Sequence, residues 1–174
     1  MARSMKLVSS RRSALLSLAV ALPLLCALSG AEHSARAAVR VTLAVFVAKD
    51  SPIQNLKMSE LRRIFTNADD SGFSGTRSIP FNHTARSSDR VGFDQTVLRM
   101  SPEEVSRFWI DRKIRGLPGP PRAVDSLSQL LRLVTNTNAG MGYARPNQVT
   151  KEVRVIRIDG KLPSEAGYPL QFDE

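Results

Sequence analysis

The sequence has few cysteine and histidine residues, and this scarcity excludes several kinds of site. Its 174 residues include one cysteine and two histidines. Cys26 and His33 both lie in an N-terminal segment that we expect to be removed, so the remainder has no thiol, disulfide or thiolate metal site. His83 is then the only histidine, which excludes a pair of histidine metal ligands and a catalytic His–Cys pair. We therefore expect no metal and no cofactor, and a domain held together by its hydrophobic core.

Aromatic residues are also scarce, at 6% of the chain, whereas basic residues are abundant. There are 25 Lys and Arg residues against 16 Asp and Glu residues, a formal net charge of +9. Five of the basic residues and one acidic residue precede Ala38, which leaves 20 and 15, or a net charge of +5. These charges are dispersed, and no Lys/Arg cluster alternates with aromatic residues, so we expect no nucleic-acid partner. The remaining positive charge would favour the approach of small anions.

Residues 1–37 have the layout of an export signal. Four basic residues among the first 12 precede residues 13–31, an uncharged and mostly apolar stretch that small residues follow. A retained membrane anchor is the competing interpretation, but serines, Pro23 and Gly30 interrupt the apolar window. We expect cleavage after Ala35-Arg36-Ala37, so that the mature chain begins at Ala38; a cut near Ala31 is the alternative. The sequence therefore predicts a periplasmic protein.

A few residues favour one export route and one type of signal over the alternatives. Ser10-Arg11-Arg12-Ser13 resembles a twin-arginine signal, but Ala14 stands where a bulky apolar residue would be expected. The general Sec route is therefore favoured over the twin-arginine route. Leu25 precedes Cys26 where a lipid-anchored protein would have a small residue, so a lipoprotein is not expected.

Residues 38–174 are predicted to form one domain. No Gly/Ser-rich or Pro-rich linker divides them, and no repeat is present. A domain of about this size buries roughly two thirds of the surface of its unfolded chain, which is enough for a stable core. Only the acidic end, residues 162–174, is expected to be loosely ordered.

Alternating hydrophobic residues predict the strands. Residues 39–47 are apolar on both faces, which is typical of a strand in the middle of a covered sheet. Further strands are predicted at residues 77–82, 141–144 and 153–158.

Capping residues followed by apolar residues three and four positions apart predict the helices. The strongest start is Ser101-Pro102-Glu103-Glu104, and Val105, Phe108 and Trp109 form the expected buried stripe of that helix. Other helices are predicted to start at Ser59, at Ser87 or Ser88, and at Ser126, and residues 67–75 form a loop by composition. Strands that alternate with helices predict an α/β domain whose mostly parallel sheet is flanked by helices on both sides.

The sequence offers no candidate for catalysis. It has no G-x-S-x-G nucleophile elbow and no glycine-rich nucleotide-binding motif. The acidic pairs Asp69-Asp70 and Glu103-Glu104 lie in a Gly/Ser loop and in a helix start, where acidic residues are usually exposed. We therefore do not expect an enzyme.

Residues 82–88 form the most distinctive polar segment. It leads from a predicted strand end into a predicted helix, where ligands usually bind in α/β sheets. Hydroxyl groups, a guanidinium and the free amide groups of a helix start would all favour an anion. A plainer interpretation also fits: Ser87 or Ser88 caps the helix while Arg86 and Arg90 point into water.

The order of several segments resembles the phosphate ABC transporter substrate-binding proteins, which have the type 2 periplasmic-binding fold. The matching segments lie between about Val41 and Ile158 and read AVFVAKDSPIQNLKMSELRRIF, GTRSIPFN, MSPEEVSRFW and AGMGYA. The most specific pieces are L-x-x-I-F at 61–65 and G-x-G-Y at 140–143. Full-length members have two lobes with the oxyanion between them, whereas this chain has residues for a single lobe that looks like the second. The resemblance implies an exported protein that binds phosphate or another small oxyanion.

The resemblance also implies which residues bind the ion. The family's phosphate loop, approximately R-S-D-G-S-G-T, aligns with residues 82–88. The candidate ligand residues are Asn82, His83, Thr84, Arg86, Ser87 and Ser88. Only Ser88 keeps the chemistry of its family counterpart, while Thr84 replaces the Asp that accepts a proton from hydrogen phosphate. Arg86 can still attract an oxyanion through its charge.

A single lobe leaves one side of the ion in water, where charge contacts are screened. A homodimer, an ABC permease or another envelope protein could supply the missing wall. The alternative function is an envelope protein-interaction module that keeps the lobe but has lost ligand binding.

Overall fold

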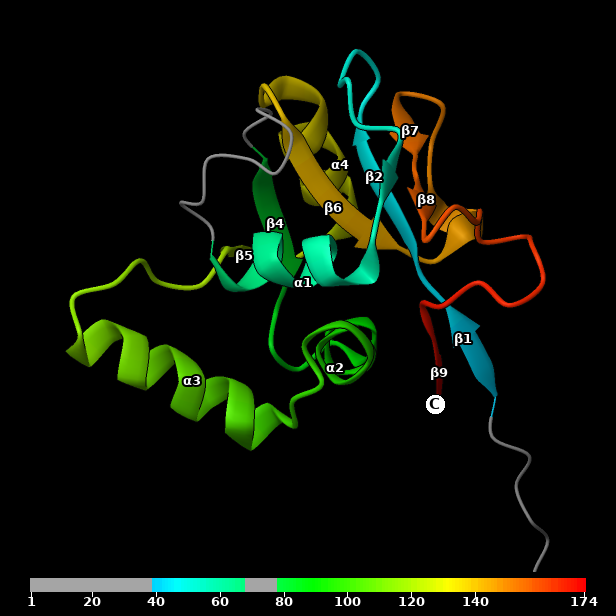
Figure 1. Cartoon of the computed structure of the whole chain (residues 1–174). Coiled ribbons are helices and arrows are strands. Elements are labelled where there is room, and N and C mark those ends of the chain that lie inside the picture. Colours follow the sequence, from blue (N-terminus) through cyan, green and yellow to red (C-terminus); the bar gives the residue numbers. More distant parts are fainter. Residues whose placement is uncertain (1–38, 68–77) are drawn as a thin grey trace, which may run out of the picture. The chain divides into compact units, whose positions relative to one another are not determined.

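A five-stranded mixed sheet forms the centre of the structure, a computed structural model that describes residues 39–67 and 78–174 (Figure 1). Its strand order is β5-β4-β6-β2-β7. The five strands are β2 (Ala44–Ala48), β4 (Ile79–His83), β5 (Arg122–Val124), β6 (Gly140–Ala144) and β7 (Val153–Val155). Four of the five run in one direction, and β2, antiparallel to both β6 and β7, is the reversed one.

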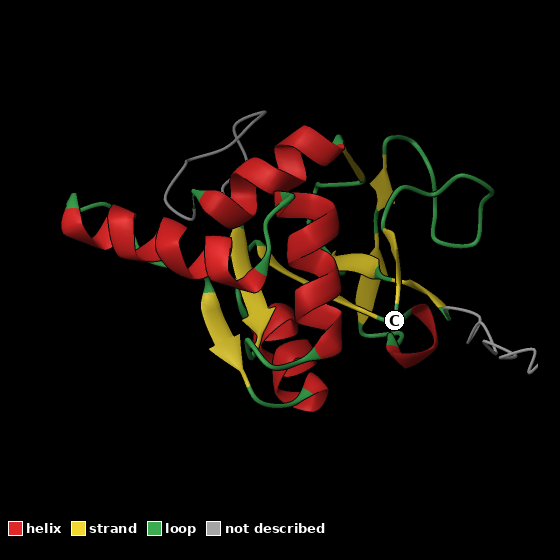
Figure 2. Ribbon diagram, turned by 90° about the horizontal axis from the view of Figure 1, so that it is seen from below, coloured by secondary structure: helices red, strands yellow, loops and turns green. Residues whose placement is uncertain are grey.

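Helices cover both faces of this sheet, as predicted (Figures 1 and 2). The helices are α1 (Met58–Thr66), α2 (Ser88–Phe93), α3 (Pro102–Ile114) and α4 (Leu127–Asn136). A π-helical turn, Asp94–Leu98, continues α2, and a short 3-10 turn, Pro146–Gln148, follows β6. The α/β prediction is confirmed, and none of the helices in the described ranges is long and apolar enough to cross a membrane.

Two hydrophobic clusters lie on opposite faces of the sheet because its central strands are apolar on both sides. Every residue of β2 is buried; Val45 and Val47 belong to the cluster under α1 and α2, and Phe46 belongs to the cluster under α4. The predicted stripe of α3 also packs inward, with Val105 and Trp109 buried and Phe108 partly buried. The sequence pattern therefore identified the core on both faces.

Short strand pairs connect the remaining segments. These strands are β1 (Arg40–Thr42), β3 (Asn55–Leu56), β8 (Arg157–Ile158) and β9 (Gln171–Asp173). β3 pairs with β8 in parallel, and β1 pairs with β9 antiparallel. The predicted strands 39–47 and 153–158 are thus each divided in two, because their outer parts leave the central sheet for these separate pairs.

The structure corrects two local predictions. The first helix begins at Met58 rather than after a Ser59 cap, and the backbone N–H of Lys57 donates to the Glu60 carboxylate at 2.7 Å. The end of the chain, expected to be loosely ordered, is packed: Tyr168 and Leu170 are buried and Gln171–Asp173 form β9. The predicted export signal (1–37) lies outside the described residues, as does the predicted loop 67–75 beyond Asn67.

The two glycines of the G-x-G-Y segment allow β6 to approach α4 and β2 closely. A Cβ on Gly140 would lie 2.7 Å from the Val134 carbonyl oxygen and 2.9 Å from its Cα. A Cβ on Gly142 would meet only side chains, those of Leu130 and Phe46, at 3.1 to 3.2 Å. The backbone contact at Gly140 cannot relax by a side-chain rotation, whereas the contacts at Gly142 can.

We therefore predict that Gly140→Ala lowers the free energy of unfolding by about 2 kcal/mol or more, within the range of overpacked cores. Gly142→Ala is the matched control and should cost clearly less. Urea denaturation of the two variants measures the difference. Equal losses would show that helix α4 does not hold β6 through this backbone contact.

Candidate functional site

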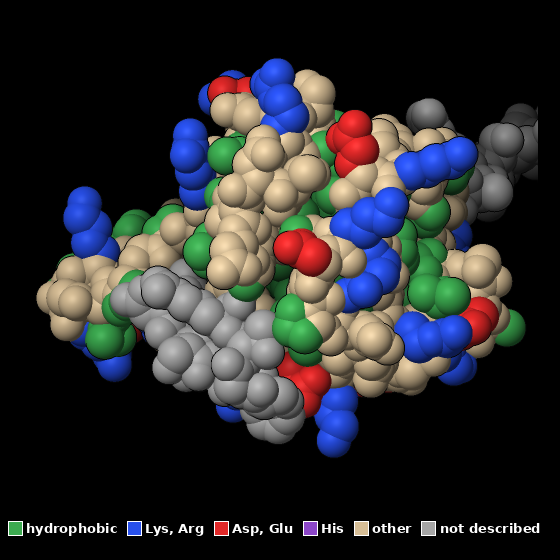
Figure 3. Space-filling view, turned by 90° about the horizontal axis from the view of Figure 1, so that it is seen from above, with side chains coloured by type: hydrophobic (Ala, Val, Ile, Leu, Met, Phe, Trp, Pro, Cys, Tyr) green, Lys and Arg blue, Asp and Glu red, His purple; other side chains and the backbone are tan. Residues whose placement is uncertain are grey.

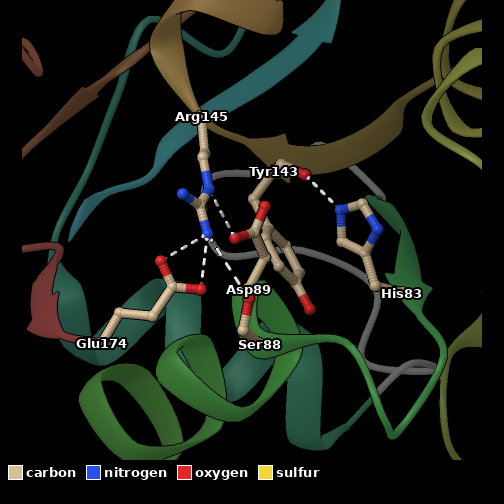
Figure 4. A network of polar contacts seen from close by, with 6 residues as sticks. All are labelled: His83, Ser88, Asp89, Tyr143, Arg145 and Glu174. Carbon is tan, nitrogen blue, oxygen red and sulfur yellow. Dashed lines mark hydrogen bonds and ion pairs between the residues drawn. The ribbon is translucent and has the colours of Figure 1, made fainter.

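The candidate site lies where β4 and β6 end and α2 begins. His83 is the last residue of β4, Arg145 follows β6, and Ser88 is the first residue of α2 (Figure 4). Because β4 and β6 are parallel neighbours, their carboxyl ends lie at the same edge of the sheet. Ligands of α/β sheets bind at such edges.

Tyr143 supports this edge from inside the core. Its ring stacks on Phe93 of α2, with centroids 3.9 Å apart and planes inclined by 6°, and Phe65 packs against it edge-on. Its hydroxyl donates a hydrogen bond to the buried Asn82 Oδ1. Burial raises the pKa of this phenol well above its ordinary value of 10.0, so the hydroxyl stays protonated and remains a donor.

The side chains of His83 and Arg90 also form hydrogen bonds within the fold. His83 Nε2 lies 2.8 Å from the Tyr143 carbonyl oxygen, and the His83 ring packs edge-on against the Tyr143 ring. Arg90, expected in the plainer interpretation to point into water, is buried instead. Its Nε donates to Asp94 Oδ2 at 2.6 Å, and its Nη1 donates to the His83 carbonyl oxygen at 3.2 Å. Burial raises the pKa of Asp94, and the neighbouring Arg90 charge opposes this rise.

Arg145 is the charged centre of the exposed part of the site. Its Nε donates to Asp89 Oδ1 at 2.9 Å. Its Nη2 donates to both Glu174 carboxylate oxygens, at 2.9 and 3.0 Å, and lies 3.4 Å from Ser88 Oγ. Its side chain is 33% exposed, against 13% for Asp89, so one side of the guanidinium faces solvent.

Hydrogen bonds from Ser88 and Arg145 lower the pKa of Glu174 below its ordinary value of 4.5. The pairing favours the folded state above pH 4.5, where the carboxylate is charged in both states. This contribution is lost as the pH falls through the lowered pKa of the folded protein.

The structure thus separates the six predicted residues into two groups. Asn82 and His83 bond to Tyr143 and hold the edge together, so their polar atoms face the fold. Thr84, Arg86, Ser87 and Ser88 form the loop and helix start above them, and Arg86 and Ser88 are exposed. Within the described residues Arg86 has no hydrogen bond or ion pair. Ser87 is the N-cap residue of α2, but its side chain makes no capping hydrogen bond.

Arg145, Asp89 and Glu174 belong to this edge but were not predicted. The signal for Arg145 was present: it directly follows the predicted strand 141–144, at the carboxyl end where ligands bind. Nothing in the sequence pattern pointed to Glu174, because its position depends on pairing between β1 and β9 at opposite ends of the described domain. Within the described residues no three His, Cys, Asp or Glu side chains are grouped to hold a metal ion.

Comparison with solved structures identifies the fold. An ABC-type phosphate transport receptor from Vibrio cholerae matches with a TM-score of 0.60 at 20% identity, over 77% of this chain and 55% of that protein. A phosphate ABC transporter substrate-binding protein with bound phosphate, from Clostridium perfringens, matches with a TM-score of 0.60 at 17% identity, over 77% and 54%. The chain has the fold of phosphate-transport binding proteins.

PstS from Borrelia burgdorferi matches similarly, with a TM-score of 0.58 at 12% identity, over 78% of this chain and 56% of PstS. The chain therefore spans about half the length of these three proteins. The names of the first two describe transport proteins rather than enzymes. No family model and no curated protein matches the sequence, so the likeness concerns the fold.

We predict that Tyr143→Phe lowers the free energy of unfolding by about 1 to 3 kcal/mol, because it leaves the buried Asn82 oxygen without its donor. Tyr168→Phe is the matched control: the Tyr168 hydroxyl is also buried, but in the described part of the chain it makes no side-chain hydrogen bond, and its contact with the Val45 backbone lacks normal hydrogen-bond geometry. Removing that hydroxyl should cost little. Urea denaturation compares the two variants, and a Tyr143→Phe protein as stable as wild type would contradict the supporting role.

Proposed function

We propose that this domain binds phosphate or a closely similar oxyanion at the edge formed by residues 84–88 and Arg145. The observation that supports this most strongly is the coincidence of an anion-attracting set of groups with the phosphate-transport fold. An exposed Arg86, the Ser88 hydroxyl at a helix start and the half-exposed Arg145 all lie at the carboxyl edge of parallel strands. Guanidinium groups and helix-start amides are the usual ligands of such ions.

In this proposal the six predicted residues have different tasks. Thr84, Arg86, Ser87 and Ser88 contact the ion, and Asn82 and His83 position the loop through their bonds to Tyr143. Arg145 joins the ligand set.

Asp89, which is bonded to Arg145, places a carboxylate beside the ion. A negative charge there favours an anion that carries a proton, such as hydrogen phosphate, over sulfate, because only the former can donate a hydrogen bond to it.

The affinity of one lobe should be modest. A half-exposed ion pair contributes about 1 kcal/mol or less, because water and salt screen it. A second copy of this chain, or a permease or other envelope protein, would close the wet side of the site.

The proposed location of the protein is the periplasm. The predicted export signal and the phosphate-transport fold together support a periplasmic protein that works beside an ABC transporter. The alternative, an envelope interaction module without a ligand, has less support. On the face shown in Figure 3 some basic side chains lie next to one another, but acidic side chains lie beside them and partly balance their charge.

The proposal is tested by calorimetric titration of the protein with phosphate and with sulfate. We expect phosphate to bind more tightly than sulfate at neutral pH. Arg86→Ala and Ser88→Ala should each weaken phosphate binding, by roughly two- to fivefold for the arginine. Arg107→Ala, which removes an equal charge from an exposed position on α3, is the control and should leave the affinity unchanged.

Two results would contradict the proposal. Absence of binding at millimolar phosphate and sulfate would exclude an oxyanion site in the single chain. Binding that is equally strong in wild type, Arg86→Ala and Ser88→Ala would place the ion elsewhere.

A further inference from the structure

The carboxylate of Glu174 occupies the place where an external anion would meet Arg145. Both of its oxygens accept from Arg145 Nη2, at 2.9 and 3.0 Å, and the Ser88 hydroxyl oxygen lies 3.4 Å from the same Nη2. Figure 4 shows the Glu174 side chain reaching toward Arg145 and Ser88 from the opposite side to Tyr143. A carboxylate whose two oxygens accept from a guanidinium is bonded as a bound oxyanion would be.

Backbone pairing and packing place Glu174 there. β9 pairs with β1 through residue 173, and the Glu174 backbone N–H then donates to the Val39 carbonyl oxygen at 3.0 Å. The Phe172 ring packs directly on Gly92 of α2, where there is no room for a Cβ. The glycine therefore lets β9 lie against α2. Three contacts therefore position Glu174: the pairing of β9 with β1, the hydrogen bond to Val39 and the packing of Phe172 on Gly92.

The ion pair that Glu174 makes is nevertheless open to solvent. The Glu174 side chain is 39% exposed and the Arg145 side chain 33%. Pairs at such exposure are weak, since water competes for both charges. The carboxylate can leave Arg145 while β9 stays paired, because the backbone contacts do not involve the side chain.

We propose that Glu174 is an intramolecular competitor that fills the anion site of Arg145 and Ser88 and must be displaced when an oxyanion binds. The inference rests on the proposed function, since it concerns the same edge. A tethered competitor acts at a fixed effective concentration in the millimolar range, so it weakens binding by a constant factor whatever the protein concentration. Glu174 thereby sets the threshold concentration of free anion at which the site fills.

Asp89 does not have this role. It contacts Arg145 through Nε, not through the Nη2 that Glu174 uses, and its side chain is only 13% exposed. Asp89 is itself part of α2, whereas Glu174 follows β9. With Glu174 displaced, Arg145 stays oriented by Asp89 and presents its free Nη2 to the incoming ion.

The test is a titration of wild type, Glu174→Gln and Asp173→Asn with inorganic phosphate, monitored by calorimetry. Glu174→Gln should bind phosphate at least threefold more tightly, because it removes the competing charge. Asp173→Asn makes the same change of charge one residue away, at a side chain that is 62% exposed and whose ion pair is with Arg40. It should bind as wild type does.

A second measurement follows the Glu174 carboxyl group by NMR in wild type. Without phosphate its pKa should lie below 4.5, and saturating phosphate should move it back toward that value, because the ion displaces the carboxylate from Arg145 and Ser88.

The outcomes separate the two proposals. Tighter binding in Glu174→Gln alone, with the change in the pKa of Glu174, supports competition. Equal affinity in all three proteins, or a pKa that does not respond to bound phosphate, overturns competition but leaves the oxyanion site intact. Absence of phosphate binding in all three proteins overturns both.

Discussion

The architecture of the site depends on the burial of Tyr143. Its ring is fully enclosed between Phe93, Phe65 and the His83 ring, and its hydroxyl must find a partner there. Asn82 supplies that partner from β4, the parallel neighbour of β6. One side chain therefore links two strands and helix α2. The carboxyl ends of these strands and the start of this helix are the elements on which the polar edge is built.

Because the interior of the edge is filled in this way, only its outer layer faces solvent. Arg90 is hydrogen-bonded to Asp94 and to the His83 carbonyl oxygen. The side chains of Asn82 and His83 are hydrogen-bonded to Tyr143. Arg86, Ser88 and Arg145 remain toward solvent. A small ion gains little free energy from each contact, so its binding cannot also offset the cost of ordering a loop. A binding site for such an ion therefore needs polar groups that a packed inner layer already holds in place.

Hydrophobic period and capping residues predicted the four helices, four of the five central strands and both faces of the core. They missed β5, because it has only three residues and only one of them is buried. The signals are local: the apolar run of β2 and the Ser101 capping box are each readable within a few residues. The division of 39–47 and 153–158 into separate strands was not predictable, because it depends on which distant segment each half pairs with. The same limit applies to the site. The loop 82–88 was found from its order along the chain, whereas Glu174 reaches it only through the pairing of β9 with β1.

The central claim is that an oxyanion binds at the carboxyl ends of β4 and β6. Its most direct test maps the chemical-shift changes of the ¹⁵N-labelled protein on addition of phosphate. The account predicts the largest changes at the backbone amides of Ser88 and Asp89 and at the side-chain Nε of Arg145, with little change in α4. Changes confined to other parts of the domain, or no changes at all at millimolar phosphate, would contradict it.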